Sequence, residues 1–361
     1  MSSRMIVEGP PARRPGGGAP SPGQGRAGRR PHPAAWPAVL LLAAVTAVVT
    51  CRITDTDATT PVPQLLAFWP WLIAPTAAAL LLAALTRFRT GLVWGLAVLA
   101  ALAWFMEPYG RVGDPHGPPV AEIRVLASNV QYGRGTPALT GAVRRERPDI
   151  VFVEECDSRC LRLLDTAFPA QDRARREGRP GPPGTYPYRS QARAPGAHGS
   201  VILSRYPLVP APALPGTLRM PGATATVHGR PVRLQLAHPV PPLPDSLGRW
   251  RTDLAALRGF AAGTAAAHRT TILAGDFNAT QDHAAFRRIL DTGLRDSARL
   301  AGQARTPSWP SRTAPVLGAQ LDHVLVSADL SARGARFLGL AGTDHRALLT
   351  DLTLHGTPPV R

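Results

Sequence analysis

Residues 273–282 read LAGDFNATQD, in which an apolar run leads into a carboxylate and a carboxamide two residues apart. Side chains alternate along a β-strand, so Asp276 and Asn278 are expected on the same side of the strand end. Two oxygen-bearing side chains in that position can bind a metal ion or a phosphate group. Asp and Asn are also common in ordinary turns, so this segment alone leaves both interpretations open.

Polar groups of the same kind stand at the ends of most other apolar runs in the second half of the chain. They are Asn129 after IRVLAS, Glu155 after DIVFVE, His238 after VRLQLA, Asp322 before HVLV, and Asp344 and His345 before RALL. Each one alone is more often a turn residue, a solvated acid or an ordinary histidine. Together they favour a site for Mg²⁺, Mn²⁺ or Ca²⁺, because these cations prefer oxygen ligands. Three cysteines are too few for a cysteine-based zinc site.

The elements that must carry these residues run from Ala121 to the end of the chain. Short apolar runs of strand type alternate there with polar segments of helix type, one of them around residues 139–147. Many short strands with interspersed helices predict a layered α/β or α+β domain over residues 121–361. Residues 170–199 are rich in Arg, Gly and Pro and are predicted to form a long surface loop.

Three uncharged apolar stretches precede this domain and end at Cys51, Leu85 and Met106. A bilayer is spanned by about 20 apolar residues, with about 17 as the lower limit, so residues 35–106 are predicted to form three transmembrane helices. A buried core helix is the alternative for each stretch. Three stretches in succession make that alternative weaker, as do tryptophans in or near their ends: Trp36, Trp69, Trp71, Trp94 and Trp104. Two further spans after the first also argue against a cleaved signal peptide.

The flanking charges predict an orientation for these helices. Residues 1–34 carry six Arg and one Glu without apolar periodicity, which predicts a disordered Arg/Pro/Gly-rich tail. Basic residues mark the cytoplasmic side of a membrane, so the N-terminus is predicted to be cytoplasmic. Residues 107–120 contain Gly and Pro and are predicted to be a linker. The chain is thus expected to be a multi-pass protein of the cell membrane with its catalytic domain outside the cytoplasm.

The chain is strongly basic, with a formal net charge of +17 and a pI of about 11.4. A basic protein often binds nucleic acid. Here all 41 basic residues are Arg, and the excess runs through the N-terminal tail as well as the domain. This distribution indicates a compositional bias of the whole chain more than a nucleic-acid-binding face.

Seven stretches, taken in order, resemble the endonuclease/exonuclease/phosphatase superfamily of DNase-I-like metal-dependent phosphoesterases. They are VLASNVQYG, PDIVFVEEC, HGSVILSRYPL, LQLAHPVPP, LAGDFNA, LDHVLVS and TDHRALL. The resemblance covers roughly residues 123–354. The resemblance implies a four-layered α/β sandwich, two packed mixed sheets flanked by helices. It also implies a phosphoester hydrolase that uses Mg²⁺, with Mn²⁺ as the other candidate, at a site where strand ends meet.

The resemblance assigns a role to each matched position. The metal contacts are Glu155, Asn129 and Asp344. Among the residues assigned to catalysis, Asp276 orients or deprotonates the attacking water, and Asn278 holds that water and a phosphate oxygen. Asp322 and His345 form the family's Asp–His pair. His238 lies near the leaving group or a phosphate oxygen. A metal ion and a histidine would neutralise charge that builds on phosphorus, while a carboxylate prepares water for in-line attack.

Two departures from the family pattern affect these assignments. Glu154 stands where the family commonly has Gln, which leaves two adjacent carboxylates. Strand alternation would turn only one of them into the site, and the motif favours Glu155. The family's glutamate partner for His238 is not identifiable. Cys156 and Cys160 follow directly and are expected to form a disulfide across a short loop in an exported domain, with two buried thiols as the alternative.

The order of the predicted segments adds information about the substrate. Apolar spans before an extracytoplasmic domain of this superfamily resemble actinobacterial membrane proteins linked to teicoplanin resistance, an antibiotic resistance. That resemblance implies a phosphatase for a lipid-linked pyrophosphate such as undecaprenyl pyrophosphate. The expected partners are then membrane lipids and a phosphorylated lipid substrate, without a protein partner. The alternatives are a membrane-tethered endonuclease or exonuclease acting on nucleic acid, and a non-catalytic binding module on the same fold.

Overall fold

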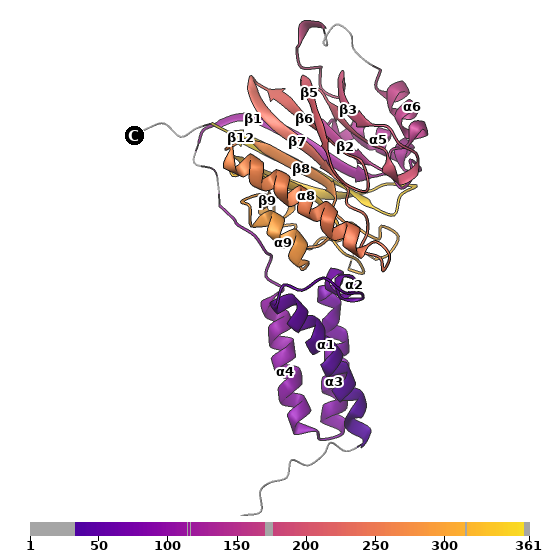
Figure 1. The fold of residues 1–361 in the computed structure, drawn as a ribbon, viewed down its shortest axis with the longest axis vertical. Helices are drawn as coiled ribbons and strands as arrows, with labels where there is room; N and C mark the ends of the chain where they lie inside the picture. The colour runs from indigo at the N-terminus through magenta and orange to yellow at the C-terminus, as the bar shows by residue number, and fades with distance from the viewer. Residues whose placement is uncertain (1–32, 114, 116, 170–175, 315, 357–361) are drawn as a thin grey trace, which may run out of the picture.

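The computed structural model describes residues 33–113, 115, 117–169, 176–314 and 316–356. Almost all of the predicted tail 1–34 therefore lies outside the described residues, as do residues 170–175 of the predicted surface loop. The described chain forms an α/β domain that sits on one end of a narrow bundle of apolar helices (Figure 1).

Two six-stranded mixed sheets make up the domain. The first has the order β11 (Leu330–Gly339), β12 (Arg346–His355), β1 (Pro119–Asn129), β2 (Ile150–Glu154), β4 (Ser200–Ser204) and β3 (Tyr188–Ala192). The second has the order β5 (Leu208–Leu214), β6 (Met220–Val227), β7 (Arg230–Ala237), β8 (Thr271–Asp276), β10 (Asp322–Val326) and β9 (Arg295–Asp296). The β1–β2 and β7–β8 pairs are parallel, whereas the other pairs are antiparallel.

Helices cover the outer face of each sheet. They are α5 (Thr136–Glu146) and α6 (Ser158–Ala167) on the first sheet, with α8 (Leu247–Ala266) and α9 (Ala284–Leu290) on the second. The short helix α10 (Ser297–Leu300) instead contributes Ala298 to the core between the sheets. In β1 the side chains of Val125 and Ala127 pack between the sheets, while Leu126 packs under the helices. A strand buried on both faces needs a continuous apolar run, which is why VLA appears there without alternation. The architecture confirms the predicted sandwich of two mixed sheets flanked by helices.

The prediction of one long loop over residues 170–199 is wrong. Residues 188–192 form β3, which pairs with β4, and the buried Tyr186 donates its hydroxyl to the carbonyl of Pro148 at 2.7 Å. Strand β3 is an edge strand with only one buried side chain, so its sequence lacks the apolar alternation of a half-buried strand. Strand β5 was missed for a related reason, because Pro210 and Pro212 argue against a strand, yet proline is tolerated at a sheet edge.

The apolar N-terminal part forms a bundle of α1 (Trp36–Ile53), α3 (Ile73–Leu85) and α4 (Arg89–Trp104), which lie side by side in Figure 1. Among the described residues, one helix, Pro33–Ile53, is long and apolar enough to cross a membrane, and Trp69–Leu85 and Arg89–Trp104 are shorter. The second predicted span is not one continuous helix. It breaks into α2 (Val62–Ala67), the 3₁₀ turn η2 (Trp69–Leu72) and α3, since Pro70 lacks the N–H that a continuous helix needs there.

The domain contacts the end of the bundle through buried polar groups. Asp57 accepts a hydrogen bond from the backbone N–H of Ala285 at 2.7 Å, and His283 lies 2.8 Å from the carbonyl of Pro63. Asp282 forms an ion pair with Arg305 at 2.6 Å, and Arg305 also donates to the carbonyl of Phe105 at 2.7 Å. Buried polar groups with defined partners hold the domain in one orientation relative to the helices.

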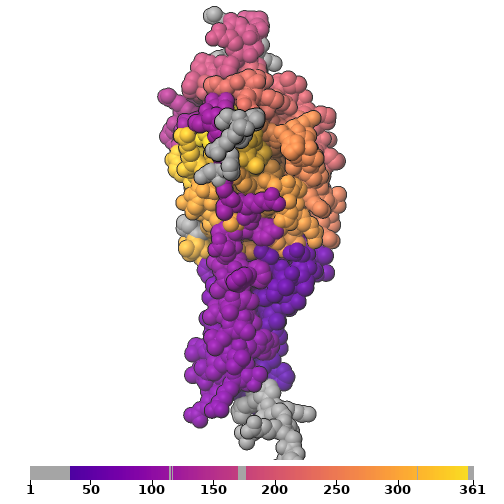
Figure 2. All heavy atoms as spheres, turned by 90° about the vertical axis from the view of Figure 1, so that its left-hand side faces the viewer, coloured from indigo at the N-terminus to yellow at the C-terminus, as the bar shows by residue number. Residues whose placement is uncertain are grey.

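The segment predicted as a linker packs against the domain. It leaves α4 and passes over one face of the domain before β1, which Figure 1 shows as a ribbon and Figure 2 shows as purple atoms. Tyr109 donates its backbone N–H to Gln281 at 2.9 Å and its hydroxyl to Asp291 at 2.7 Å. These contacts add to the connection between domain and bundle.

Candidate active site

Strand pairing brings the predicted site residues to one edge of the two sheets. In the first sheet Asn129 pairs with Glu154 at the ends of the parallel strands β1 and β2. In the second sheet Asp322 begins β10 directly opposite Asp276, the last residue of β8. His345 immediately precedes β12, the neighbour of β1. Residues that are up to 216 positions apart, from Asn129 to His345, therefore meet because strand pairing brings the ends of β1 and β8 and the beginnings of β10 and β12 to one edge of the sheets.

A continuous series of contacts joins these side chains. Asn129 Nδ2 donates to Glu155 Oε1 at 3.0 Å and to Asp276 Oδ2 at 3.1 Å. Asp276 Oδ2 lies 3.7 Å from His345 Nε2. The other ring nitrogen of His345, Nδ1, lies 2.8 Å from Asp322 Oδ2. The amide of Asn129 thus links the carboxylate of Glu155 to the Asp322–His345–Asp276 group.

The Asp322–His345 pair is electrostatically coupled to Asp276. Burial disfavours the charged imidazolium of His345, but the carboxylates of Asp322 and Asp276 outweigh burial and raise the pKa of His345 to about 10. Burial raises the pKa of Asp276 to about 7, against the lowering effect of His345. A protonated His345 that donates from Nδ1 to Asp322 presents its Nε2–H toward Asp276 and the space in front of it.

Asp276 and Asn278 lie together, but a turn and not strand alternation places them. Strand β8 ends at Asp276, and Asn278 has a φ of +47°, a left-handed conformation that Asn tolerates better than most residues. The backbone N–H of Asn278 donates to Asp276 Oδ1 at 2.8 Å, and Asn278 Nδ2 lies 3.4 Å from Asp276 Oδ2. The metal-site and turn interpretations of LAGDFNATQD are therefore compatible, because the turn itself positions both side chains.

The expectation that only one of Glu154 and Glu155 lies at the site is wrong. Glu155 has a φ of +55°, so strand alternation ends at Glu154 and both carboxylates lie at the site end. Glu154 is fully buried between the sheets against Gly275, where an added Cβ would lie 2.7 Å from Glu154 Oε1. Neither carboxylate oxygen of Glu154 has a hydrogen-bond partner among the described residues. Burial, with Asp322 and Asp276 nearby, raises the pKa of Glu154 well above its ordinary value.

Glu155 and His238 occupy the other side of the site. Glu155 Oε2 accepts the backbone N–H of Tyr132 at 2.9 Å, while Oε1 lies 4.0 Å from His238 Nε2. Burial lowers the pKa of His238 to about 3, and the charge of His345 acts in the same direction, so this ring is neutral. The sequence did not identify an acidic partner for His238. In the structure the acid next to His238 is Glu155, a residue that was predicted as a metal contact.

Asp344 is held by residues that the sequence did not indicate. Trp309 Nε1 donates to Asp344 Oδ2 at 3.2 Å, and Ser308 Oγ accepts the backbone N–H of Asp322 at 3.1 Å. Thr343 Oγ1 donates to the carbonyl of Asn129 at 2.8 Å, which fastens the 343–345 turn to β1. Trp309 and Ser308 lie outside the seven stretches that resemble the family, so no signal in the sequence indicated them. Thr343 is the first residue of TDHRALL and could have been found from that motif.

The donor set fits a divalent cation. Asp276, Asp322 and His345 each offer a ligand atom, and these atoms lie within 4.8 Å of one another. Asp322 Oδ1 is buried and has no hydrogen-bond partner in the described part of the chain, so an oxygen is available for an ion. Oxygen donors with at most one imidazole suit Mg²⁺ or Mn²⁺. The predicted contacts Glu155 and Asn129 adjoin this group, whereas Asp344 is engaged by Trp309.

Cys156 and Cys160 form a disulfide in the structure. The bond joins the turn after Glu155 to the first turn of α6, whose N-terminus is capped by Asp157 through the backbone N–H of Cys160 at 2.8 Å. The backbone N–H of Cys156 also donates to the carbonyl of Gly199 at 2.8 Å. The disulfide therefore supports the turn in which Glu155 adopts its positive φ.

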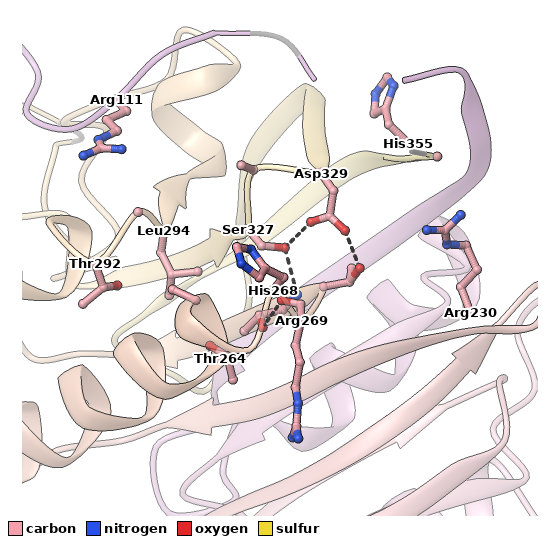
Figure 3. Close-up of a pocket in the computed structure, with 16 residues that line it drawn as sticks. Arg111, Arg230, Thr264, His268, Arg269, Thr292, Leu294, Ser327, Asp329 and His355 are labelled. Carbon is pink, nitrogen blue, oxygen red and sulfur yellow. Dashed lines mark hydrogen bonds between the residues drawn. The ribbon is translucent and has the colours of Figure 1, made fainter. Parts of the chain in front are cut away.

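A pocket of about 460 Å³ lies at the opposite end of β8 from Asp276, around Thr270 and Thr271 (Figure 3). Arg111, Arg230 and Arg269 line it, but Figure 3 shows their side chains pointing in different directions. They do not converge on a single anion. The groups able to do chemistry are gathered at the strand ends described above.

The sequence profile of the Endonuclease/Exonuclease/phosphatase family matches residues 126–345 of this chain. That range contains all eight residues assigned to metal contact or catalysis. Comparison with curated protein sequences finds no match.

Solved structures share the fold at low sequence identity. A humanised D. rerio TDP2 carrying 14 mutations is 14% identical with a TM-score of 0.51, and the alignment covers 64% of this chain and 98% of that one. An endonuclease/exonuclease/phosphatase from Bacteroides vulgatus is 13% identical with a TM-score of 0.51, covering 65% of this chain and 100% of that one. The aligned fraction of this chain, 64% and 65%, is close to the fraction that the α/β domain occupies.

Proposed function

This chain belongs to the endonuclease/exonuclease/phosphatase family, whose members are typically phosphoester hydrolases, and we propose that it is a membrane-anchored, Mg²⁺-dependent phosphatase of lipid-linked pyrophosphate. Undecaprenyl pyrophosphate is the proposed type of substrate. The catalytic domain, residues 121–361, lies outside the cytoplasm in this proposal, behind a cytoplasmic tail (1–34), three spans (35–106) and a linker (107–120).

Each site residue has a separate role in the proposed hydrolysis. Asp276 accepts a proton from the attacking water and Asn278 holds that water and a phosphate oxygen. His345, oriented through Nδ1 by Asp322, donates from Nε2 to a phosphate oxygen on which negative charge builds. His238 contacts the leaving group or a second phosphate oxygen.

Glu155, Asn129 and Asp344 are the proposed metal contacts. When bound, Mg²⁺ or Mn²⁺ would supply Lewis-acid stabilisation of charge on phosphorus. Asn129 has a further function that does not need the ion, because its amide fixes the position of Glu155 relative to Asp276.

The surface of the helix bundle supports the membrane anchor. Its outward residues include Leu40, Leu81, Leu85, Val93 and Leu96, each more than half exposed. A helix that is apolar on its outward face as well as its inward face is suited to lipid more than to water. The disulfide between Cys156 and Cys160 supports an extracytoplasmic domain, because such bonds persist in oxidising compartments.

The observation that carries the lipid substrate is the position of the site relative to the bundle. The end of β8 that bears Asp276 continues within seven residues to His283, which contacts the carbonyl of Pro63 in α2. The strand ends that carry the proposed site therefore lie on the side of the domain that faces the apolar helices (Figure 1). A site held near a bilayer meets lipid headgroups at high effective concentration.

The test uses full-length protein in lipid nanodiscs with Mg²⁺ and measures, in parallel, phosphate release from undecaprenyl pyrophosphate and cleavage of plasmid DNA. Asp276→Ala serves as the inactive protein, and Glu122→Ala, an exposed acid away from the site, is the matched control. We expect wild type and Glu122→Ala to release phosphate from the lipid and Asp276→Ala to release none. Cleavage of DNA that depends on Asp276, without lipid turnover, would replace this proposal with a membrane-tethered nuclease.

A further inference from the structure

Exposed apolar side chains gather where the catalytic domain meets the bundle. Leu243, Val316 and Leu317 of the domain are 56%, 72% and 42% exposed, and Trp71 of η2 beside them is 39% exposed. The other exposed large apolar residues in the described part of the linker and domain are scattered: Val112, Val120, Tyr132, Leu163 and Val209. We refer to Leu243, Val316, Leu317 and Trp71 together as the apolar lip.

Direct contacts join the lip to the helix bundle. Trp71 Nε1 donates to the carbonyl of Val316 at 3.1 Å. Gln64 of α2 donates its amide to the carbonyl of Pro242, the residue before Leu243. The lip is thus continuous with the apolar helices at the end of the bundle where Trp71 stands. Tryptophan favours the boundary between lipid hydrocarbon and water.

The lip is also fastened to the active site. The backbone N–H of Ser311 donates to the carbonyl of Asp344 at 2.7 Å, and Trp309 holds the Asp344 carboxylate. The Trp309 ring also lies against Phe68, which stands between α2 and η2, with ring centroids 6.4 Å apart and planes tilted by 52°. The other lip segment follows His238, and its Pro239 carbonyl accepts from Asn278 Nδ2 at 3.0 Å. Both segments of the lip therefore begin at residues of the site and end at the bundle.

We propose that the apolar lip holds the hydrocarbon chain of a phosphorylated lipid while its phosphate reaches the Asp276–His345 site. This inference rests on the proposed function and specifies how the site selects substrates. The site would take phosphoesters from the bilayer surface in preference to phosphoesters dissolved in water. A lipid is the occupant that fits, because the lip adjoins helices whose outward side chains are themselves apolar.

The first test compares two substrates on full-length protein in nanodiscs: undecaprenyl pyrophosphate in the bilayer and a short-chain, water-soluble isoprenyl pyrophosphate. The test variant is Val316→Asp with Leu317→Asp. The matched control is Val209→Asp, an equally exposed valine on β5. We expect the lip variant to lose about tenfold or more in kcat/KM on the bilayer substrate, because the apolar side chains proposed to contact the hydrocarbon chain are replaced by charged ones. Turnover of the soluble substrate should be unchanged. The Val209→Asp control should match wild type on both.

If the lip variant loses kcat/KM equally on both substrates, or on neither, the proposed role of the lip is wrong. Lipid turnover by the wild type would in that case still support the proposed function. Absence of lipid turnover by the wild type would instead overturn the proposed function, whatever the lip variant does.

A second test does not depend on activity. A nitroxide attached at Val316→Cys, in a Cys51→Ala background, reports whether this position contacts hydrocarbon. We expect greater collision with oxygen than with a water-soluble nickel chelate, and the opposite ratio at Val209→Cys. A ratio at position 316 equal to that at position 209 would contradict membrane contact.

Discussion

His345 Nδ1 lies 2.8 Å from Asp322 Oδ2, and both side chains are almost completely buried at the meeting point of the two sheets. The two residues come from different sheets, since Asp322 begins β10 of the second sheet and His345 precedes β12 of the first. The geometry of the proposed site therefore depends on the packing of one sheet against the other.

Asp322→Asn should lower kcat about 100-fold or more, because the neutral amide neither fixes the His345 tautomer nor stabilises its charge. The KM should change little, as Asp322 is not proposed to touch the substrate. Steady-state kinetics on the substrate identified in the nanodisc assay measure both constants. A matched Asp351→Asn variant, whose carboxylate pairs with Arg124 at a half-exposed position, should behave as wild type. Normal kcat in Asp322→Asn would remove the pair from the mechanism.

Chelation of divalent cations should abolish activity, and added Mg²⁺ should restore it, because the site collects oxygen donors suited to that ion. Mn²⁺ binding followed by electron paramagnetic resonance measures the site without turnover. Glu155→Gln should weaken Mn²⁺ binding about tenfold or more. Unchanged affinity in Glu155→Gln, combined with weak binding in Asp322→Asn, would place the ion at Asp276, Asp322 and His345 instead.

Glu154→Gln should stabilise the metal-free protein. Burial and the nearby carboxylates of Asp322 and Asp276 raise the pKa of Glu154 well above its ordinary value. At neutral pH this carboxyl must therefore take up a proton when the protein folds, which costs free energy that an uncharged Gln does not cost. Relief of part of that cost should raise the apparent Tm by about 3 °C or more. Differential scanning calorimetry of full-length protein in nanodiscs gives the comparison. The neighbouring Glu155→Gln should not stabilise, since both Glu155 oxygens accept hydrogen bonds. A lower Tm for Glu154→Gln would show that the carboxylate has a favourable partner in solution.

Asp282→Asn should loosen the domain from the bundle. Asp282 is buried and pairs with Arg305 at 2.6 Å and Arg52 at 3.5 Å, so its neutralisation takes the nearest counter-charge from the buried Arg52 and the largely buried Arg305. Loss of one partner from a buried ion pair costs about 3–5 kcal/mol. Hydrogen exchange of residues 53–64 and of α9 should accelerate. Glu122→Gln, which removes an exposed partner of Arg333, should leave exchange unchanged, since exposed pairs contribute about 1 kcal/mol or less. Equal exchange in Asp282→Asn and wild type would mean that other contacts suffice for docking.

Much of the α/β domain was predictable because its information is local. Strand ends carry the polar residues, and motifs such as GDFNA and TDHRALL identify the family that the profile match confirms. Strands β3 and β5 were not predictable in the same way, since edge strands pair on one side only and need not alternate. The second apolar stretch looked continuous because composition counts Pro70 as an apolar residue, whereas helix geometry does not tolerate it.

The sequence by itself determined which residue types could act and in what order they occur along the chain. Only the tertiary structure decided where they lie relative to one another. It turned Glu155 out of the strand at a positive φ and left Glu154 buried beneath the site. It also joined the end of GDFNATQD to the apolar helices through Asp282 and His283. The reason is physical: spacing along a chain sets local side-chain direction, but burial and partners depend on the packing of segments far apart in sequence.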